Sequence, residues 1–294
     1  VENGDCDKTG KVWTRQEVAA ARARRREADE AREDAEEAYF HAKNGAMKTL
    51  MDADPTLPAS IAEMLADADP AVLAADRITK GTGIAVECDI TDEASCNAAI
   101  ATAEAQLGPT DILVNNAGLS HRSAFAETEI AVLRRIMDIN FWGSVHCTKA
   151  VYETIVARRG AIVVISSTAG FAPLLGRTGY AASKHALHGL FATLRTELAD
   201  SGVDVLIAAP SFIDTPLRDH TIGGDGKITD HPQSRVGKMM TPEDVAERVV
   251  WSVERRRSTL VLGSVGKLTR YLNAVAPGMY ERMMTRSLRS ELDR

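Results

Sequence analysis

Short apolar runs alternate with longer helical patterns from Gly83 onward, and this alternation limits the possible folds more than any other feature of the sequence. The runs are rich in Val, Ile and Leu at successive positions, so both faces of each strand are expected to be buried. Buried strands separated by helices predict a parallel sheet with helices on both of its faces. The predicted strands are residues 84–88, 111–115, 161–166, 203–208 and 259–263, and the predicted helices are residues 93–107, 129–158, 180–200 and 242–256.

Right-handed crossovers between parallel strands make this arrangement an α/β, doubly wound sheet, in which ligands bind at the carboxyl ends of the strands. This domain is predicted to occupy residues 81–294. Residues 1–80 differ in character, since the stretch 14–41 is dense in Ala, Glu and Arg and contains no Gly or Pro. That composition favours a long exposed helix. We therefore treat residues 1–80 as a separate helical, charged segment of unknown role.

The composition argues against several classes of protein. The formal net charge of −6 gives no electrostatic footprint for nucleic acid. No apolar run approaches the roughly 18 to 20 residues that span a bilayer, and the polar start is unlike a signal peptide. Cys6, Cys88, Cys96 and Cys147 form no CxxC pair and lack metal-ligand spacing. They predict scattered, reduced thiols in a cytoplasmic protein, with no metal site.

One pair of side chains suggests acid–base chemistry. Tyr180 and Lys184 are four residues apart in a predicted helix, so they share one face. An ammonium near a phenol stabilises the phenolate, which lowers a pKa that starts near 10 and suits general acid–base catalysis. Alone this pair is a weak signal, because the same spacing occurs by chance on many helix surfaces.

The surroundings of the pair strengthen the signal. The strand at 161–166 delivers Ser166 and Ser167 to its carboxyl end, where a doubly wound sheet builds its site. The strand at 111–115 leads into Asn116 and Gly118, and the glycine lets the backbone approach a ligand. Asn140 lies inside a long helical pattern, where asparagine is unfavourable without a specific contact.

Together these motifs closely resemble the short-chain dehydrogenase/reductase family from about residue 84 to residue 294. The family's NNAG motif stands unchanged at 115–118, and its YxxxK motif is Tyr180 and Lys184. The resemblance implies a Rossmann-like sheet and identifies the catalytic residues as Asn140, Ser167, Tyr180 and Lys184. It places NAD or NADP against Asp89, Ile90, Asn116, Ala117, Gly118, Tyr180, Lys184, Pro210, Ile213 and Thr215, with the adenine lying along Asp89 and Ile90.

The resemblance implies hydride transfer between the nicotinamide cofactor and a carbonyl or secondary alcohol. Tyr180 would exchange the proton of the substrate hydroxyl, and Ser167 would hydrogen-bond the carbonyl oxygen as negative charge develops on it. Lys184 would lower the pKa of Tyr180 and hold the nicotinamide ribose. Asn140 would anchor a water that relays protons from Lys184 to solvent. The family's usual glycine after Pro210 is replaced by Ser211.

The sequence departs from the family at its amino-terminal end. Residues 1–83 contain no TGxxxGxG turn, whose backbone binds the pyrophosphate, and no β-rich run. The sheet is therefore expected to lack its first two strands, which leaves the strand at 111–115 with an open edge. Either the amino-terminal helices cover that edge or the chain is incomplete. The alternative function is accordingly a catalytically impaired family member that acts through interactions.

The carboxyl-terminal residues 267–292 are basic and amphipathic on both sides of Pro277. Three interpretations remain open: packing onto the same domain, lining a pocket for an apolar substrate, and peripheral contact with a membrane. A similar tail in family members that reduce lipophilic ketones favours an apolar substrate. The apolar positions are Leu268, Leu272, Val275, Met279, Met283, Met284 and Leu288.

The resemblance also implies a homodimer or homotetramer. Family members commonly pair two long helices across a two-fold axis, and here these would be the helices at 129–158 and 180–200. Such a contact would bury Ala186, Leu190 and Leu194.

Overall fold

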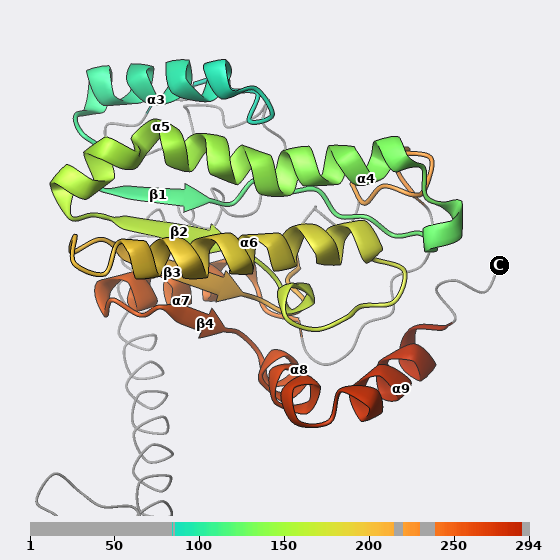
Figure 1. Cartoon of the computed structure of the whole chain (residues 1–294). Helices are drawn as coiled ribbons and strands as arrows, with labels where there is room; N and C mark the ends of the chain where they lie inside the picture. Colours follow the sequence, from blue (N-terminus) through green and yellow to red (C-terminus); the bar gives the residue numbers. More distant parts are fainter. Residues whose placement is uncertain (1–83, 85, 215–219, 230–238, 290–294) are drawn as a thin grey trace, which may run out of the picture. The chain divides into compact units, whose positions relative to one another are not determined.

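A computed structural model of the protein describes residues 84, 86–214, 220–229 and 239–289 (Figure 1). Within this part of the chain, four parallel strands form one sheet in the order β1-β2-β3-β4. The predicted α/β, doubly wound sheet is confirmed. Its strands are β1 (Ile112–Asn115), β2 (Ala161–Ile165), β3 (Asp204–Ala209) and β4 (Thr259–Val261).

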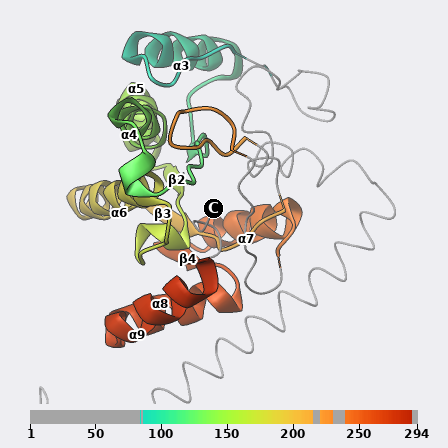
Figure 2. The ribbon, with the colours of Figure 1, turned by 90° about the vertical axis from the view of Figure 1, so that its right-hand side faces the viewer.

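Helices cover both faces of this sheet. Viewed along the strands, α4, α5 and α6 lie on one side and α7 lies on the other (Figure 2). The helices predicted at 93–107, 180–200 and 242–256 are confirmed, with ends shifted by no more than three residues. The α-helices are α3 (Glu93–Leu107), α4 (Ile130–Met137), α5 (Gly143–Arg158), α6 (Thr178–Glu197), α7 (Pro242–Glu254), α8 (Ser264–Val275) and α9 (Pro277–Leu288).

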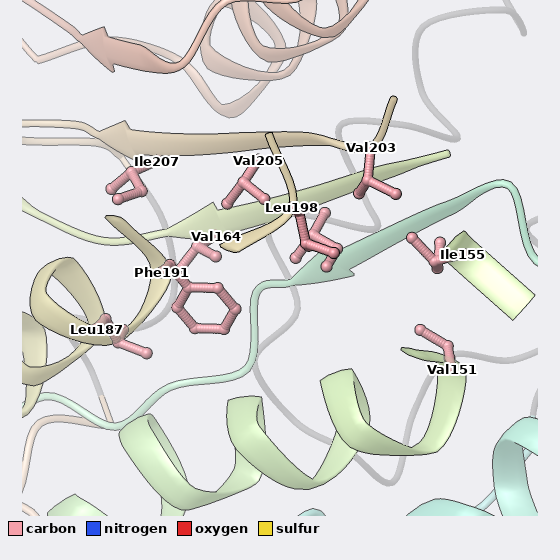
Figure 3. Packing of buried hydrophobic residues seen from close by; sticks show 10 residues of the cluster. Val151, Ile155, Val164, Leu187, Phe191, Leu198, Val203, Val205 and Ile207 are labelled. Atoms are coloured by element: carbon pink, nitrogen blue, oxygen red, sulfur yellow. The ribbon is translucent and has the colours of Figure 1, made fainter. Parts of the chain in front are cut away.

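The core explains why the strands are apolar at successive positions. Ile162 and Val164 of β2 pack with Phe191 of α6 in one buried cluster (Figure 3). Val163, between them in sequence, belongs to a second cluster with Val245 and other residues on the opposite side of the sheet. Successive strand residues point to opposite faces, so a strand covered on both sides needs an apolar residue at every position.

The long helix predicted at 129–158 is interrupted. Between α4 and α5 the backbone widens into one π-helical turn, η3 (Asp138–Trp142), which contains Asn140. A π turn frees backbone groups from the regular ladder and often marks a functional position in a helix. Here it accompanies a buried asparagine that would be unfavourable in a regular α-helix.

The strand predicted at 84–88 is wrong, because residues 84 and 86–88 form no strand. A strand needs a neighbour for its backbone N–H and C=O groups, and no strand among the described residues adjoins this segment. In the same described part of the chain, β1 pairs only with β2. Ile112 and Val114 of β1 are accordingly 52% and 36% exposed.

The helix predicted in residues 14–41 lies outside the described residues, as do Cys6 and Thr215. None of the helices within the described residues has the length and apolar character needed to cross a bilayer.

Candidate active site

The carboxyl end of β2 supplies the first elements of the candidate site. Ser167 follows the strand and caps the short helix η4 (Thr168–Gly170), its Oγ accepting a hydrogen bond from the backbone N–H of Ala169 at 3.2 Å. The Ser167 side chain also lies near enough to the Tyr180 phenol to act on its pKa as a hydrogen-bond partner. A hydroxyl and a phenol from different elements therefore meet where the sequence predicted a catalytic pair.

Tyr180 and Lys184 lie on one face of α6, as their spacing predicted. The Lys184 ammonium is buried and donates a hydrogen bond to the carbonyl oxygen of Ile165 at 2.9 Å. Its Nζ lies 5.8 Å from the centre of the Tyr180 ring. A Cβ added at Gly118 would lie 3.6 Å from this Nζ, so the NNAG turn passes close to the ammonium.

Burial dominates the electrostatics of both groups. It lowers the pKa of Lys184 from 10.5 to about 8, because a buried ammonium loses its hydration. It also raises the pKa of Tyr180, while the Ser167 hydrogen bond and the positive charge of Arg177 oppose that rise. The predicted lowering of the Tyr180 pKa by Lys184 is therefore wrong for the protein alone. Desolvation of the phenolate outweighs the neighbouring charges.

The Asn140 side chain binds the backbone of Leu119, the residue that directly follows the NNAG turn. Its Nδ2 donates to the carbonyl oxygen of Leu119 at 3.0 Å and to the Ser183 Oγ at 2.9 Å, and its Oδ1 accepts from the Leu119 N–H at 2.6 Å. Both amide hydrogens are thus used within the protein. The relay through a water on Asn140 stays a prediction, while a positioning role for its side chain is evident from these bonds.

A cavity of about 430 Å³ opens in front of Ser167 and Tyr180. It brings together predicted site residues from three strand ends and α6: Asn116, Gly118, Ser167, Tyr180, Lys184, Pro210 and Ile213. The predicted positions Asp89, Ile90, Ala117 and Asn140 do not line it. Thr215 lies outside the described residues.

The other wall of the cavity comes from α8 and α9, at the carboxyl-end side of the strands (Figure 1). Three contacts fix the helix pair to the segment after β2: Asn273 donates to Phe171 O at 2.8 Å, Tyr280 donates to Pro173 O at 3.2 Å, and Leu175 N–H donates to the Met284 sulfur at 3.2 Å. The pair therefore packs onto its own domain and also lines the cavity. These are two of the three arrangements considered for residues 267–292, and they occur together. The predicted apolar residues in this wall are Leu268, Leu272, Met283, Met284 and Leu288.

The adenine positions predicted at Asp89 and Ile90 form a short ordered segment beside α5. The Asp89 carboxylate accepts from the N–H and the hydroxyl of Thr91 at 2.9 and 2.7 Å, and these hydrogen bonds lower the pKa of Asp89. The imidazole Nδ1 of His146 hydrogen-bonds the Ile90 carbonyl oxygen at 3.1 Å. The Ile90 side chain lies against Gly143, where an added Cβ would come within 2.8 Å of it.

Two features of the site do not follow from the predictions made from the sequence. Arg177 is 5% exposed, lines the cavity and stands one helical turn before Tyr180, a spacing that could have drawn attention to it. The prediction of scattered thiols is wrong, because Cys88, Cys96 and Cys147 gather in one place. No spacing in the sequence announces this cluster, since Cys147 reaches it only when α5 packs on α3.

Comparison with known proteins decides the family. A family model described as short chain dehydrogenase matches residues 44–223. The chain belongs to the short-chain dehydrogenase family. The match includes residues 44–83, upstream of the region in which the motifs were recognised, and ends before β4 and the carboxyl-terminal helices.

Curated relatives lie in the same family. The chain is 37% identical to "Dehydrogenase/reductase SDR family member 7B" of Xenopus tropicalis over 205 residues, covering 69% of this chain and 66% of that protein. It is 34% identical to "Dehydrogenase/reductase SDR family protein 7-like" of Drosophila melanogaster, covering 58% of this chain and 53% of that one. The chain thus matches less than two thirds of the length of either of these short-chain dehydrogenase relatives.

Solved structures of the family share the fold. A short-chain dehydrogenase from Streptomyces avermitilis is 27% identical, with a TM-score of 0.58 over 68% of this chain and 79% of that one. A short chain dehydrogenase/reductase from Burkholderia phymatum, solved in complex with NAD, has a TM-score of 0.60 over 69% of this chain and 79% of that one at 21% identity. The second likeness carries the fold alone.

Proposed function

We propose that this short-chain dehydrogenase family member transfers a hydride between NAD or NADP and a carbonyl or secondary alcohol. The observation that carries the proposal is the convergence of Ser167, Tyr180 and Lys184 on one cavity, from the end of β2 and from α6. It brings a proton donor together with a second hydroxyl that can bind the same carbonyl oxygen. A family member that acts only through interactions would need neither this arrangement of side chains nor its placement at a cavity.

The chain's own residues divide the work. Tyr180 gives its proton to the substrate oxygen in reduction and takes it back in oxidation, while Ser167 donates a hydrogen bond to that oxygen. Lys184, fixed to Ile165 O, places a positive charge between the tyrosine and the NNAG turn. Asn140 holds that turn in place through Leu119.

The cavity fits a nicotinamide cofactor on its NNAG side. Gly118 leaves room beside Lys184 Nζ, because a side chain there would meet this atom and Asn140 Oδ1 at 3.6 and 3.4 Å. Asn116, Pro210 and Ile213 complete this side of the cavity. The cofactor supplies the hydride, and these residues would hold its nicotinamide end.

The substrate we propose is apolar. The wall opposite the NNAG turn consists largely of Leu and Met side chains from α8 and α9, including Leu272, Met283 and Met284. Flexible methionines adapt to irregular apolar ligands. Arg177 at the same cavity gives one charged position near the reacting oxygen.

Replacing Tyr180 by Phe tests the activity. Tyr180→Phe removes only the hydroxyl, so reduction of a lipophilic ketone by NADPH or NADH should fall by about 100-fold or more in kcat, with the fold unchanged. The matched control is Tyr271→Phe on α8, a tyrosine that is 65% exposed and does not line the cavity. Near-normal turnover in Tyr180→Phe would refute the assignment.

Cofactor titration separates the alternative function. NADH and NADPH fluorescence enhancement should saturate on the full chain if it is an oxidoreductase. A folded chain that neither binds nor turns over the cofactor would favour the alternative, a family member that acts only through interactions.

The same helix pair also supports peripheral contact with an anionic membrane surface. Leu268, Tyr271, Val275, Met279 and Met283 are 48 to 65% exposed. The basic residues Lys267, Arg270, Arg282, Arg286 and Arg289 are also exposed, against one acid, Glu281. An apolar face bordered by basic side chains is typical of helices that bind anionic lipid.

Vesicle sedimentation tests this contact. The chain should sediment with phosphatidylserine-containing vesicles and much less with pure phosphatidylcholine, because only the former attract the basic residues. Met279→Glu should reduce binding, whereas Leu107→Glu, at an equally exposed apolar position on α3, should not. Equal sedimentation of both variants would argue against membrane contact through α8 and α9.

A further inference from the structure

Three cysteine side chains meet beside the Asp89–Ile90 segment. The Cys96 sulfur lies 3.9 Å from the Cys88 sulfur and 3.8 Å from the Cys147 sulfur. These distances are van der Waals contacts, and all three thiols are free. Cys96 is therefore the central member of a cluster assembled from the segment before Asp89, from α3 and from α5.

This cluster lies directly against the backbone that the adenine is expected to touch. The Cys96 sulfur is 3.9 Å from the carbonyl oxygen of Asp89 and 3.7 Å from that of Ile90. The Asp89 N–H donates to the Ser95 Oγ at 2.9 Å, one residue before Cys96. Movement at Cys96 or Cys88 is thus transmitted to Asp89 and Ile90 through direct contacts.

The three thiols differ in access. Cys96 is 0% exposed, whereas Cys88 and Cys147 are partly exposed. Burial raises the pKa of Cys96 and of Cys147, which leaves little thiolate on either to react with an oxidant in solution. Cys88 and Cys147 both touch the central thiol, but Cys147 is held inside α5, whereas Cys88 lies in irregular chain and can approach Cys96 without disturbing a helix.

We propose that Cys88 and Cys96 are a site of reversible oxidation, which a hydroperoxide converts to a disulfide that displaces the Asp89–Ile90 segment. The formation of the bond is independent of catalysis. Its effect on cofactor binding rests on the proposed function.

The chemistry balances in two steps. The Cys88 sulfur attacks the peroxide, so the O–O bond breaks and the products are a sulfenic acid on Cys88 and an alcohol, or water from hydrogen peroxide. The Cys96 sulfur then attacks Cys88, an S–S bond forms, the S–O bond breaks, and the hydroxyl leaves as water with the Cys96 proton. Two thiols lose two electrons, which the peroxide gains, and the sulfur contact of 3.9 Å favours this partner over a distant thiol.

Formation of the bond changes the local geometry. The two sulfurs must approach from 3.9 Å to about 2.05 Å, so the side chains must rotate, the backbone of the segment must shift, or both. The bond closes a ring over the seven residues between Cys88 and Cys96, which include Asp89, Ile90 and Asp92, the amino-terminal cap of α3. The hydrogen bonds from Asp89 N–H to Ser95 and from His146 to Ile90 O are then strained or lost. Oxidation should therefore weaken contact with the adenine.

Disulfide mapping tests the site without reference to activity. The full chain is treated with hydrogen peroxide, alkylated, digested and analysed by mass spectrometry, with and without later reduction. We expect one reversible disulfide joining Cys88 to Cys96, while Cys6 and Cys147 stay free during oxidation and are then alkylated. Cys88→Ser and Cys96→Ser should each abolish the bond. Cys6→Ser, the matched control, should leave it unchanged.

Several results would overturn the proposal: four alkylated thiols after peroxide, a sulfinic acid on Cys88 without a bond, or a bond to Cys6 or Cys147. Because serine at the fully buried Cys96 could unfold the chain, Cys88→Ser at the partly exposed position provides the independent test.

Coupling to the cofactor is measured on the mapped samples. Titration with NADH and NADPH should give an affinity about fivefold or more weaker for the oxidised chain, restored by a thiol reductant. Equal affinity in both states refutes the coupling. A chain that binds neither cofactor in either state fails the proposed function, whereas the mapped disulfide would still stand.

Discussion

At the scale of single residues, burial sets the chemistry of the site. The same loss of hydration lowers the pKa of Lys184 and raises that of Tyr180, because it disfavours whichever form is charged. Both groups are thereby held closer to neutrality than in water. Burying an ionisable group lowers the stability of the folded state, and such a loss of stability is typical of functional sites.

Burial of the Lys184 ammonium destabilises the fold, so Lys184→Met should increase the free energy of unfolding by an amount that depends on pH. The unfolded chain holds the lysine proton below pH 10.5 and the folded chain below about 8, so in that window the unfolded state binds more protons and wild-type stability rises with pH. The variant lacks this dependence. It should be more stable by up to about 3 kcal/mol at pH 7, less the lost hydrogen bond to Ile165.

Urea unfolding at pH 7, 8.5 and 9.5 measures this gain, which should shrink as the pH rises. Lys149→Met, at an exposed position on α5, is the control and should change stability little at any of these pH values. A gain in Lys184→Met that grows with pH would contradict the assigned direction of the shift.

Arg177→Leu should raise the pKa of Tyr180, because the guanidinium charge opposes the rise caused by burial. The alkaline shift should appear in the pH profile of alcohol oxidation, where the phenolate acts as the base. Arg134→Leu, at an exposed position on α4, should leave the profile in place. An unmoved profile in Arg177→Leu would show that its charge does not reach the phenol.

At the scale of elements, the close approach of backbone segments decides which residues the turns accept. Gly160 joins α5 to β2, and a Cβ there would collide with the carbonyl oxygen of Asp111 at the start of β1. Gly189 in α6 has no atom near such a Cβ. A side chain is therefore excluded at Gly160 and tolerated at Gly189, and only the packing around each glycine distinguishes the two positions.

Gly160→Ala should destabilise the fold by about 1–3 kcal/mol, because backbone cannot move aside as a flexible side chain can. Gly189→Ala is the matched control and should stabilise by about 0.5–1 kcal/mol, since alanine restricts the unfolded chain and favours helix. Chemical denaturation of both variants checks the contrast. A neutral Gly160→Ala would show that β1 and β2 shift more easily than the packing indicates.

At the scale of the whole molecule, assembly remains a prediction. Leu190 and Leu194 are already partly buried against the core of their own domain, so less of them is left for a partner than the sequence suggested. We still expect the outer faces of α5 and α6 to pair in a homodimer, which can pair again to form a tetramer.

Light scattering at micromolar concentration should report a dimer or tetramer. Ala186→Arg, placed on the expected face of α6, should shift the population toward monomer because it introduces an unpaired charge at the contact. Ala101→Arg, at an exposed position on α3, should not. A monomer in the unmodified chain would refute the assembly.

The sequence by itself determined the α/β class and most element positions, and its resemblance to the family's motifs pointed to Ser167, Tyr180 and Lys184 as partners. These follow from local periodicity and from motifs at fixed spacing, which depend on few distant contacts. Even there, its expectation for the Tyr180 pKa had the wrong direction, because burial cannot be read from spacing.

Only the tertiary structure decided which elements met. Residues 84 and 86–88 of the predicted strand form no strand, because a strand depends on a neighbour that no local pattern supplies. The tertiary structure brought α8 and α9 over the cavity, and it gathered Cys88, Cys96 and Cys147 from distant positions. Such contacts join residues far apart in the chain, and their energies depend on packing and desolvation that exist only in the folded molecule.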